Sequence, residues 1–300
     1  RYGWNFADQV PDPVIDPDGH GTHVAGIIGA EGNNGIGTTG VTWDVQLMSL
    51  DVFGKAGDGA TGMLKFWYRV LDAINYAVNN GADIINMSLG EVFNLNARQF
   101  FEKYPQWHED TLNPFERAVE NGTSIVIAAG NEELNFNTER WVSYPAVYSE
   151  FIPGVMSVAS VANNGEFASY SNVGSKVTIA APGGYIDYEK DKDSSRGILS
   201  TIPISKYDGM DGTSMASPVV AGSAALIKAE NPSLNPRQIE DVLDRSADKY
   251  KEFGDLVKDG NYLNLDEAIR VASKYKESAI SKPVEREGSK RGDVITGGNG

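Results

Sequence analysis

The sequence contains no cysteine and only three histidines among its 300 residues. Without cysteine there can be no disulfide, no thiolate nucleophile and no zinc ion held by sulfur, so any metal must be bound by oxygen or by histidine. No apolar run reaches the roughly 18 residues of a membrane-spanning helix. A signal peptide begins with a basic segment followed by an apolar one, and the first residues of this sequence do not show that pattern. We therefore expect a soluble protein.

Basic residues are also scarce relative to acidic ones. Lys and Arg number 26 against 41 Asp and Glu, which gives a formal net charge of −15. No basic block interrupts this acidic composition. A polyanionic backbone would be repelled by such a chain, so nucleic acid is excluded as an expected partner.

What the sequence does contain is a regular alternation of short apolar runs and helical patterns. The runs at 45–52, 83–89, 124–129, 155–161 and 177–181 predict strands. Helical spacing over 63–78, a cap at Asn113 followed by Pro114, and starts near 214, 235–236 and 266 predict helices. This rhythm indicates an α/β fold in three layers, a mostly parallel sheet with helices on both faces, whose ligands bind at the carboxyl ends of the strands. We expect one domain over 1–275 and a linker or tail over 276–300, where apolar periodicity is lost.

Two of the three histidines, His20 and His23, lie in the stretch GHGTHVAG at 19–26. They could form a metal site, contain a catalytic base, or be polar residues at the start of a helix. Zinc sites on helices place histidines four residues apart, usually with a glutamate between them, whereas here the spacing is three and Gly-Thr lies between. Metal binding by this pair is therefore disfavoured.

Two further segments add chemistry to this histidine pair. In DGTSMASP, residues 211–218, Ser214 stands just before a helix of small residues, where a hydroxyl can sit at the positive end of the helix dipole. In AAGN, residues 128–131, Asn131 follows a buried strand and offers an amide donor. Together the three segments indicate a base, a nucleophile and a donor to an oxyanion.

The motifs HGTHVAG, AAGN and GTSMASP, in this order, resemble those of the subtilisin-like serine proteases, the subtilase family. The resemblance extends from about residue 19 to about residue 272. It implies a serine endopeptidase in which Ser214 is the nucleophile, His20 the general base and Asn131 the side-chain donor to the oxyanion, with the Ser214 N–H as second donor. His23 is then a packing residue.

The resemblance also implies where a substrate binds. Ser88, Leu89 and Gly90 would pair with the peptide backbone on one side, and Gly57, Asp58 and Gly59 on the other, so that the peptide is added as a strand. The wall of the pocket for the residue before the scissile bond would be formed by Ala128, Ala129 and Gly130, with Ser143 near its floor. This small neutral floor favours an apolar side chain. Expected partners are protein or peptide substrates.

The stretch EGNNGIGT at 31–38 resembles the calcium loop of the family. The implied ligands are the Asn34 side chain and the carbonyl groups of Glu31, Ile36 and Thr38, which are oxygen donors that suit calcium. The alternative is a surface loop rich in Gly and Asn. We expect calcium as a structural cofactor, and a secreted or extracellular location by family resemblance.

One part of the family pattern has no counterpart. The family order is Asp, His, Ser, with the Asp at the end of a buried strand before the histidine. Asp8, Asp12, Asp16 and Asp18 lie in a Pro-rich stretch, and none follows such a strand. A strand-like segment at 293–298 has Thr296 where the acid would stand, and we interpret it as coincidence.

Two explanations remain open for the missing acid. In the first, the chain belongs to an active protease whose opening, Asp-bearing segment was removed or supplied separately, in which case the chain alone is nearly inert and its cleaved N-terminal fragment or propeptide is a partner. In the second, the chain is an inactive relative that serves as a binding or scaffold protein. The complete set of His20, Ser214 and Asn131 favours the first explanation.

Overall fold

The computed structural model describes residues 3–11, 16, 18–53, 60–138, 140–184 and 197–275. Helices are α1 (His20–Gly29), α2 (Ala60–Asn79), α3 (Ala97–Lys103), α4 (Pro105–Glu120), α5 (Thr213–Glu230), α6 (Pro236–Ser246) and α7 (Leu265–Lys274). Strands are β1 (Trp4–Asn5), β2 (Leu50–Asp51), β3 (Ile84–Met87), β4 (Glu91–Phe93), β5 (Ser124–Ala128), β6 (Val142–Tyr144), β7 (Val155–Val161), β8 (Ile179–Pro182), β9 (Ile198–Ile202), β10 (Lys206–Met210), β11 (Asp248–Lys249) and β12 (Asn261–Tyr262).

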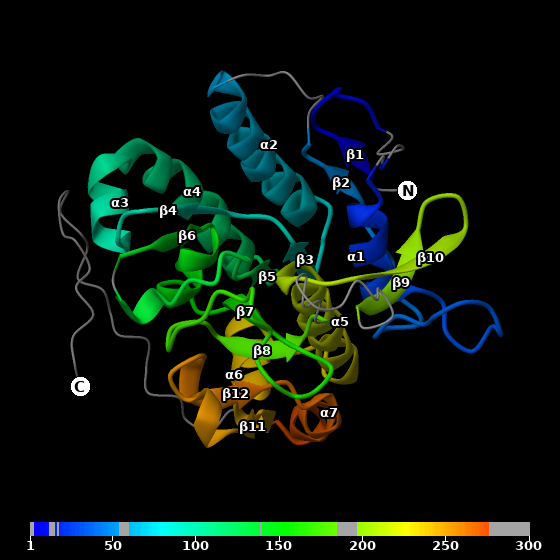
Figure 1. The fold of residues 1–300 in the computed structure, drawn as a ribbon. Coiled ribbons are helices and arrows are strands. Elements are labelled where there is room, and N and C mark those ends of the chain that lie inside the picture. The colour runs from blue at the N-terminus through cyan, green and yellow to red at the C-terminus, as the bar shows by residue number, and fades with distance from the viewer. Residues whose placement is uncertain are drawn as a thin grey trace.

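The centre of the molecule is a six-stranded sheet in the order β11-β12-β8-β7-β5-β3 (Figure 1). All neighbouring pairs are parallel except β11 with β12. Parallel strands need long crossover connections. α3 and α4 lie in the connection from β3 to β5, and α5 and α6 lie in the connection from β8 to β12. The register aligns Ile85 with Ile125 and Ile125 with Val155, so apolar side chains stack across the sheet. The predicted α/β fold is confirmed.

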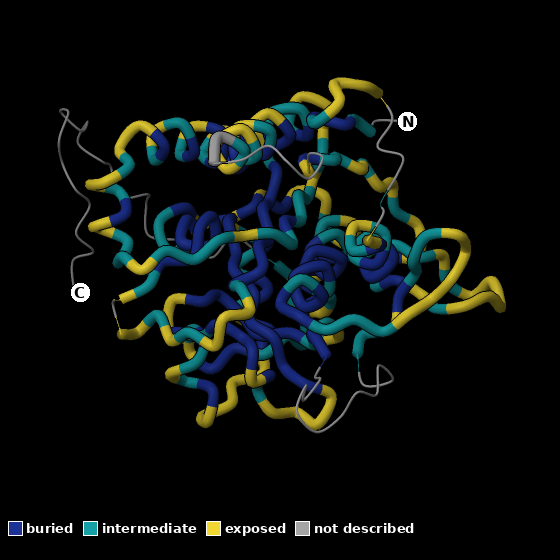
Figure 2. The backbone as a smooth tube through the Cα atoms, turned by 45° about the horizontal axis from the view of Figure 1, so that its top comes forward, coloured by how far each residue is buried: buried dark blue, intermediate teal, exposed yellow. Residues whose placement is uncertain are grey.

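Alternate residues of β5 show why the fold has three layers. Ile125 and Ile127 pack into the apolar cluster formed with α2 and α4, whereas Val126 points to the opposite face, into the cluster formed with α5, α6 and α7. Successive side chains of a strand point to opposite faces, so a strand that is apolar throughout must be covered on both sides. Figure 2 shows this central part of the chain as buried, with exposed residues on the outer turns and loops.

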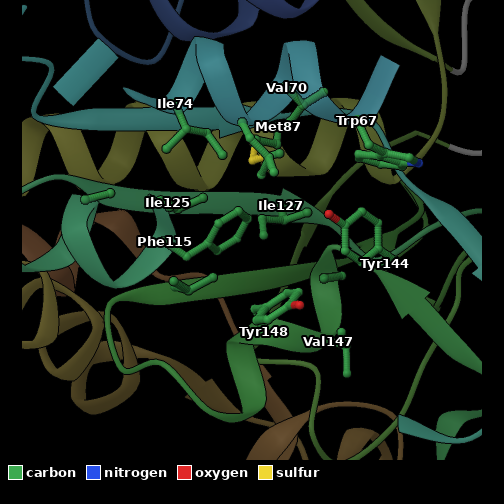
Figure 3. Packing of buried hydrophobic residues seen from close by; sticks show 14 of the residues in the cluster. Trp67, Val70, Ile74, Met87, Phe115, Ile125, Ile127, Tyr144, Val147 and Tyr148 are labelled. Carbon is green, nitrogen blue, oxygen red and sulfur yellow. The ribbon is translucent and has the colours of Figure 1, made fainter. Parts of the chain in front are cut away.

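The cluster on the α2 and α4 side is rich in aromatic residues (Figure 3). The Tyr144 ring packs edge-on against Trp67, with ring centroids 4.5 Å apart. Its buried hydroxyl is satisfied by the Trp107 indole N–H at 2.9 Å and by the Thr111 hydroxyl at 2.7 Å. Burying a hydroxyl without such partners would cost stability, so this arrangement fixes α4 against β6.

One helix begins earlier than its sequence signals predict. Asn113 and Pro114 predict a helix start, but Pro114 lies inside α4, which begins at Pro105. The missing Pro114 N–H costs one helical hydrogen bond to the residue four positions earlier. Trp107, Thr111 and Phe115, at helical spacing, are all buried on one face of α4. Burial of this face outweighs the lost bond.

Other elements differ in extent from their predictions. The strand predicted over 45–52 is reduced to β2, which pairs with β1 in a separate two-stranded sheet. The antiparallel hairpin of β9 and β10 was not predicted. The helix start predicted at 235–236 is confirmed, and the Asn235 side chain caps this helix by accepting the Gln238 N–H at 3.0 Å. The predicted tail, 276–300, lies outside the described residues. Within the described part of the chain, no helix is both long and apolar enough to cross a bilayer.

Candidate active site

Ser214 is the second residue of α5, and the residue that caps the start of this helix is Gly212. Gly212 precedes the helix with φ 146°, a conformation that residues with a side chain rarely adopt, and its N–H donates to the Gly183 carbonyl at 2.9 Å. α5 packs against β3, β5, β7 and β8. The helix thus begins at the carboxyl end of the sheet and presents Ser214 at its positive pole.

Asn131 follows β5, and its amide orientation is determined by Thr213. Both the Thr213 N–H and the Thr213 hydroxyl lie 2.9 Å from Asn131 Oδ1. A backbone N–H can only donate, so the atom that it contacts must be the amide oxygen. The NH₂ group of Asn131 is therefore directed away from Thr213. The exposed Asn131 side chain keeps this donor available to a bound molecule.

His20 is the first residue of α1, and acidic residues stabilise this helix start. The Asp18 carboxylate accepts the His20 N–H at 3.1 Å, and the Asp16 carboxylate accepts the Thr22 N–H at 2.6 Å. Burial by itself would raise the pKa of Asp16, but hydrogen bonds with Thr22, Asp18 and Gly19 together outweigh it and lower the pKa. Carboxylates at a helix N-terminus also interact favourably with the dipole. Asp16 and Asp18 thus cap α1.

A single cavity of about 310 Å³ unites the three predicted catalytic residues. Its walls are formed by His20, Asn131, Gly209, Met210, Asp211, Ser214 and Met215. Burial raises the pKa of the Asp211 carboxyl. The histidine comes from α1, the asparagine from the end of β5 and the serine from α5, so folding brings together residues that are far apart in the sequence.

His23, three residues after His20, is completely buried. Its Nε2 donates to the Asp208 carbonyl at 3.1 Å, which ties α1 to β10. The Ser200 hydroxyl of β9 donates in turn to the His23 carbonyl at 2.7 Å. Burial is the main cause that lowers the pKa of His23. The structure therefore places His23 as a packing residue between α1 and the hairpin, as expected.

Among the residues that the structure describes, no hydrogen bond or ion pair joins the His20 ring to a carboxylate. Asp16 and Asp18 contact backbone N–H groups of α1 instead, and Asp8 accepts from the Asn5 amide. Asp12 and the segment 293–298 lie outside the described residues. The described part of the chain thus provides two of the three groups of a Ser-His-Asp arrangement.

Within the described residues, none of the predicted substrate-binding positions lines the cavity. Ser88, Leu89 and Gly90 follow β3 and lead into β4, which pairs with β6. A methyl group at Gly90 would lie 3.2 Å from the Tyr144 carbonyl oxygen, so a side chain would crowd β6. Ser143, on β6, is 5% exposed. Gly57, Asp58 and Gly59 lie outside the described residues.

The other predicted wall, Ala128 to Gly130, is held rigidly. Ala128 and Ala129 are buried. The Gly130 N–H donates to the Thr213 hydroxyl at 3.1 Å, and the Gly130 carbonyl accepts the Asn172 N–H at 3.0 Å. Gly130 itself has φ 107°. These bonds anchor the turn from which Asn131 projects.

The predicted calcium loop, 31–38, lies on the surface. Asn34 Oδ1 accepts the Ile36 N–H at 2.9 Å, which closes a local turn, and Ile36 is 67% exposed. Within the described residues, no group of three or more His, Asp or Glu side chains is arranged to hold a metal ion. The oxygen donors of the loop suit calcium, and Glu31 is its one carboxylate.

Sequence reasoning missed several residues of this site. Asn86 lies within β3 and hydrogen-bonds to Ser88 and to Ser217 of α5. Thr213 orients Asn131. A signal for Asn86 existed, because it is a polar residue within the apolar strand Ile-Ile-Asn-Met. Asp211 and Met210, which line the cavity, had no signal other than their nearness to Ser214 in the sequence.

Comparison with known proteins places the chain in one family. The model of the subtilase family matches residues 2–268. The major intracellular serine protease of Bacillus subtilis (strain 168) is 36% identical over 273 residues, which cover 90% of this chain and 72% of that protein. Subtilisin NAT of Bacillus subtilis subsp. natto is 34% identical over 247 residues, and the match covers 82% of this chain but 55% of that protein. The chain thus spans about half the length of such subtilisins.

Solved structures agree with this comparison. A protease from Pseudoalteromonas arctica PAMC 21717 superimposes with a TM-score of 0.66 at 35% identity, covering 85% of this chain and 71% of that one. A cold-adapted subtilisin-like serine proteinase gives a TM-score of 0.61 at 28% identity, and the match covers 83% of this chain and 76% of that one. The family model extends over most of the chain and includes His20, Asn131 and Ser214, which line one cavity. The chain belongs to the subtilase family.

Proposed function

We propose that the protein is a serine endopeptidase in which Ser214 is the nucleophile, His20 the general base and Asn131 a donor to the oxyanion. The observation that carries this proposal is the cavity lined by all three side chains. Membership of a family whose relatives include serine proteases supports it. A serine nucleophile, a histidine base and an amide donor in one cleft are the groups that acyl transfer to a serine uses.

In the proposed mechanism, the Ser214 hydroxyl attacks the carbonyl carbon of the scissile peptide bond while His20 accepts its proton. The oxygen that becomes negative accepts hydrogen bonds from Asn131 Nδ2 and from the Ser214 N–H, at the positive end of α5. His20 then donates the proton to the leaving amine. Water then attacks the acyl carbon while His20 accepts its proton, and His20 returns that proton to Ser214 Oγ as the acyl–oxygen bond breaks.

We propose further that the acid of the triad is carried by a strand that precedes residue 1 in the full protein. Two observations support this. The His20 ring has no carboxylate partner among the described residues. Among the described residues, β3 pairs with β5 alone, and its Ile84 and Ile85 are only half-buried, so this edge of a parallel sheet can accept a strand.

The test uses a fluorophosphonate, which labels an activated serine. The longest protein that the gene encodes should be labelled, and its Ser214→Ala variant should not. Residues 1–300 expressed alone should react far more slowly, since in subtilisin itself removal of the acid costs about 3 × 10⁴ in kcat. A folded full-length protein that resists labelling would instead support the inactive binding or scaffold protein.

For the substrate, we propose a peptide bound as an extended strand between residues 88–90 and 57–59, with an apolar side chain before the scissile bond. The half-buried residues Ser88 and Leu89 and the lack of a side chain at Gly90 support the first of these edges. Peptides with Phe or Leu before the cleaved bond should be hydrolysed faster than those with Lys or Glu. The reverse order would contradict the proposed pocket of Ala128, Ala129, Gly130 and Ser143.

We also propose that the 31–38 loop binds calcium through Asn34 and the carbonyl groups of Glu31, Ile36 and Thr38. An ion that binds only the folded form stabilises it by mass action. A chelator should therefore lower the Tm, and added calcium should restore it, whereas magnesium should not. In an Asn34→Ala variant, the chelator should have a smaller effect. An unchanged Tm in chelator would leave the loop as ordinary surface.

The proposed location is extracellular, and the proposed protein partner is the cleaved N-terminal fragment or propeptide. Relatives differ in this respect: one is named as intracellular, and a halolysin-like protease of Natrialba magadii is named as extracellular. Fractionation of the source cells would decide the location. Mass spectrometry of the protein purified from its source would detect a second, N-terminal peptide.

A further inference from the structure

The second turn of α5 contains a proline that removes a backbone donor. In an α-helix, the carbonyl of Ser214 would accept the N–H of the residue four positions later. That residue is Pro218, which lies inside α5 and has no N–H. The carbonyl of the proposed nucleophile is therefore left without its helical partner. Ser214 is half-buried, and a donor from elsewhere in the chain can replace the missing helical partner of its carbonyl.

Ser88 supplies this donor from the neighbouring chain segment after β3. Its hydroxyl donates to the Ser214 carbonyl at 2.7 Å. A hydroxyl has one hydrogen, so Ser88 Oγ can then only accept from other groups. It does so from Asn86 Nδ2 at 3.0 Å. The direction of each bond follows from the Ser214 carbonyl, which can only accept.

Asn86 extends the same chain of bonds back to α5. Its Oδ1 accepts the hydroxyl of Ser217 at 2.7 Å, and Ser217 is completely buried. Ser217 lies one helical turn after Ser214. The amide of Asn86 and the hydroxyl of Ser88 thus connect both turns to the end of β3. These partly buried hydrogen bonds restrict the position of the groups that they join.

We propose that Asn86 and Ser88 are positioning residues that hold Ser214 in its reactive geometry. The role rests on the proposed function, and it gives the Ser88 side chain a task separate from substrate binding. A displacement of about 1 Å at a reacting group can cost about 10²-fold in rate. Without the Ser88 hydroxyl, the first turn of α5 loses its bond to the sheet at the residue that must attack the substrate.

The experiment compares variants of the full protein encoded by the gene. Ser88→Ala and Asn86→Ala remove the network, and Ser88→Thr keeps the hydroxyl. Ser223→Ala is the matched control, because Ser223 is also a completely buried serine of α5, but its hydroxyl donates within the helix, to the Val219 carbonyl at 2.8 Å. For each variant, kcat and KM on a peptide and the rate of fluorophosphonate labelling are measured beside the urea midpoint of unfolding.

We expect Ser88→Ala and Asn86→Ala to lower kcat and the labelling rate about 10- to 100-fold with little change in KM. Ser223→Ala should retain the wild-type rates, and Ser88→Thr should recover most of the loss. Equal labelling of wild type and Ser88→Ala would overturn this inference alone, as would a raised KM with unchanged kcat. Failure of Ser88→Thr to exceed Ser88→Ala would also overturn it.

The outcomes remain decisive if one variant does not fold. Should Asn86→Ala unfold, the Ser88→Ala and Ser88→Thr pair still tests the bond to the Ser214 carbonyl. A folded wild-type protein that is not labelled would contradict the proposed function, and the positioning role with it. Labelling of the wild type that is unaffected by either Ser88 variant would contradict the positioning role only.

Discussion

At the scale of single residues, the side-chain amide of Asn131 is held in one orientation by Thr213. Thr213 binds the Asn131 amide oxygen twice, through its N–H and its hydroxyl, and Thr213 is completely buried. The amide therefore does not need to reorganise when negative charge develops on a bound carbonyl oxygen. Preorganised donors of this kind contribute more to the transition state than to the ground state.

Asn131→Leu should therefore lower kcat of the full-length enzyme with little change in KM. In subtilisin itself, removal of the side-chain oxyanion donor costs about 10² to 10³ in kcat, and we expect a loss of this size. Steady-state kinetics on a peptide substrate would measure it. A raised KM with unchanged kcat would show that Asn131 stabilises the bound substrate and the transition state equally, which would contradict its role as an oxyanion donor.

At the scale of elements, helix starts in this protein are set by side chains as well as by packing. α6 begins with a reciprocal pair of bonds: the Asn235 side chain accepts the Gln238 N–H, and the Gln238 side chain accepts the Asn235 N–H at 2.9 Å. Its buried face, which includes Ile239, Val242 and Leu243, packs in the cluster with α5 and α7. Capping and packing thus agree at this helix.

Asn235→Ala should lower the free energy of unfolding by about 1 kcal/mol, since it leaves helix N–H groups without their partner. Asn235→Asp keeps the acceptor and should be close to wild type. Urea unfolding followed by circular dichroism would measure both variants. A loss of the same size in Asn235→Asp would mean that the amide has a role other than capping.

At the scale of the whole molecule, buried ionisable groups link stability to pH. Burial lowers the pKa of both His23 and His108. Burial raises the pKa of the carboxyl groups of Glu150 and Glu240. As the pH falls, the two histidines therefore lower the free energy of unfolding, whereas the two carboxyl groups raise it.

Below the ordinary histidine pKa of about 6.5, the unfolded chain binds protons that the folded histidines do not, so their contribution to stability is present above this pH and is lost as the pH falls. The urea midpoint should thus decrease between pH 7.5 and pH 5.5. A His108→Gln variant should show a smaller decrease, which separates the histidine effect from that of the carboxyl groups. An identical decrease in the variant would contradict this assignment.

The sequence alone determined the class of fold and pointed to the three side chains that we propose as reactive. A strand that is buried on both faces needs apolar residues at nearly every position. The run at 124–129 shows this pattern in the sequence, and β5, which it forms, is buried along its whole length. The histidine, asparagine and serine motifs are also local, since each combines a reactive residue with the small residues that let the backbone turn. The cavity unites those three residues, as the motifs predicted.

Only the tertiary structure decided how these residues are held. The start of α4 at Pro105 depends on contacts with Tyr144, and the β9–β10 hairpin depends on bonds to α1. The Ser88 hydroxyl contacts a carbonyl 126 positions away, which becomes free only because Pro218 lies in the same helix. Such contacts join residues distant in sequence, and no local pattern carries information about them. The position of Ser214 is therefore a property of the packed molecule, whereas its chemistry is a property of its own side chain.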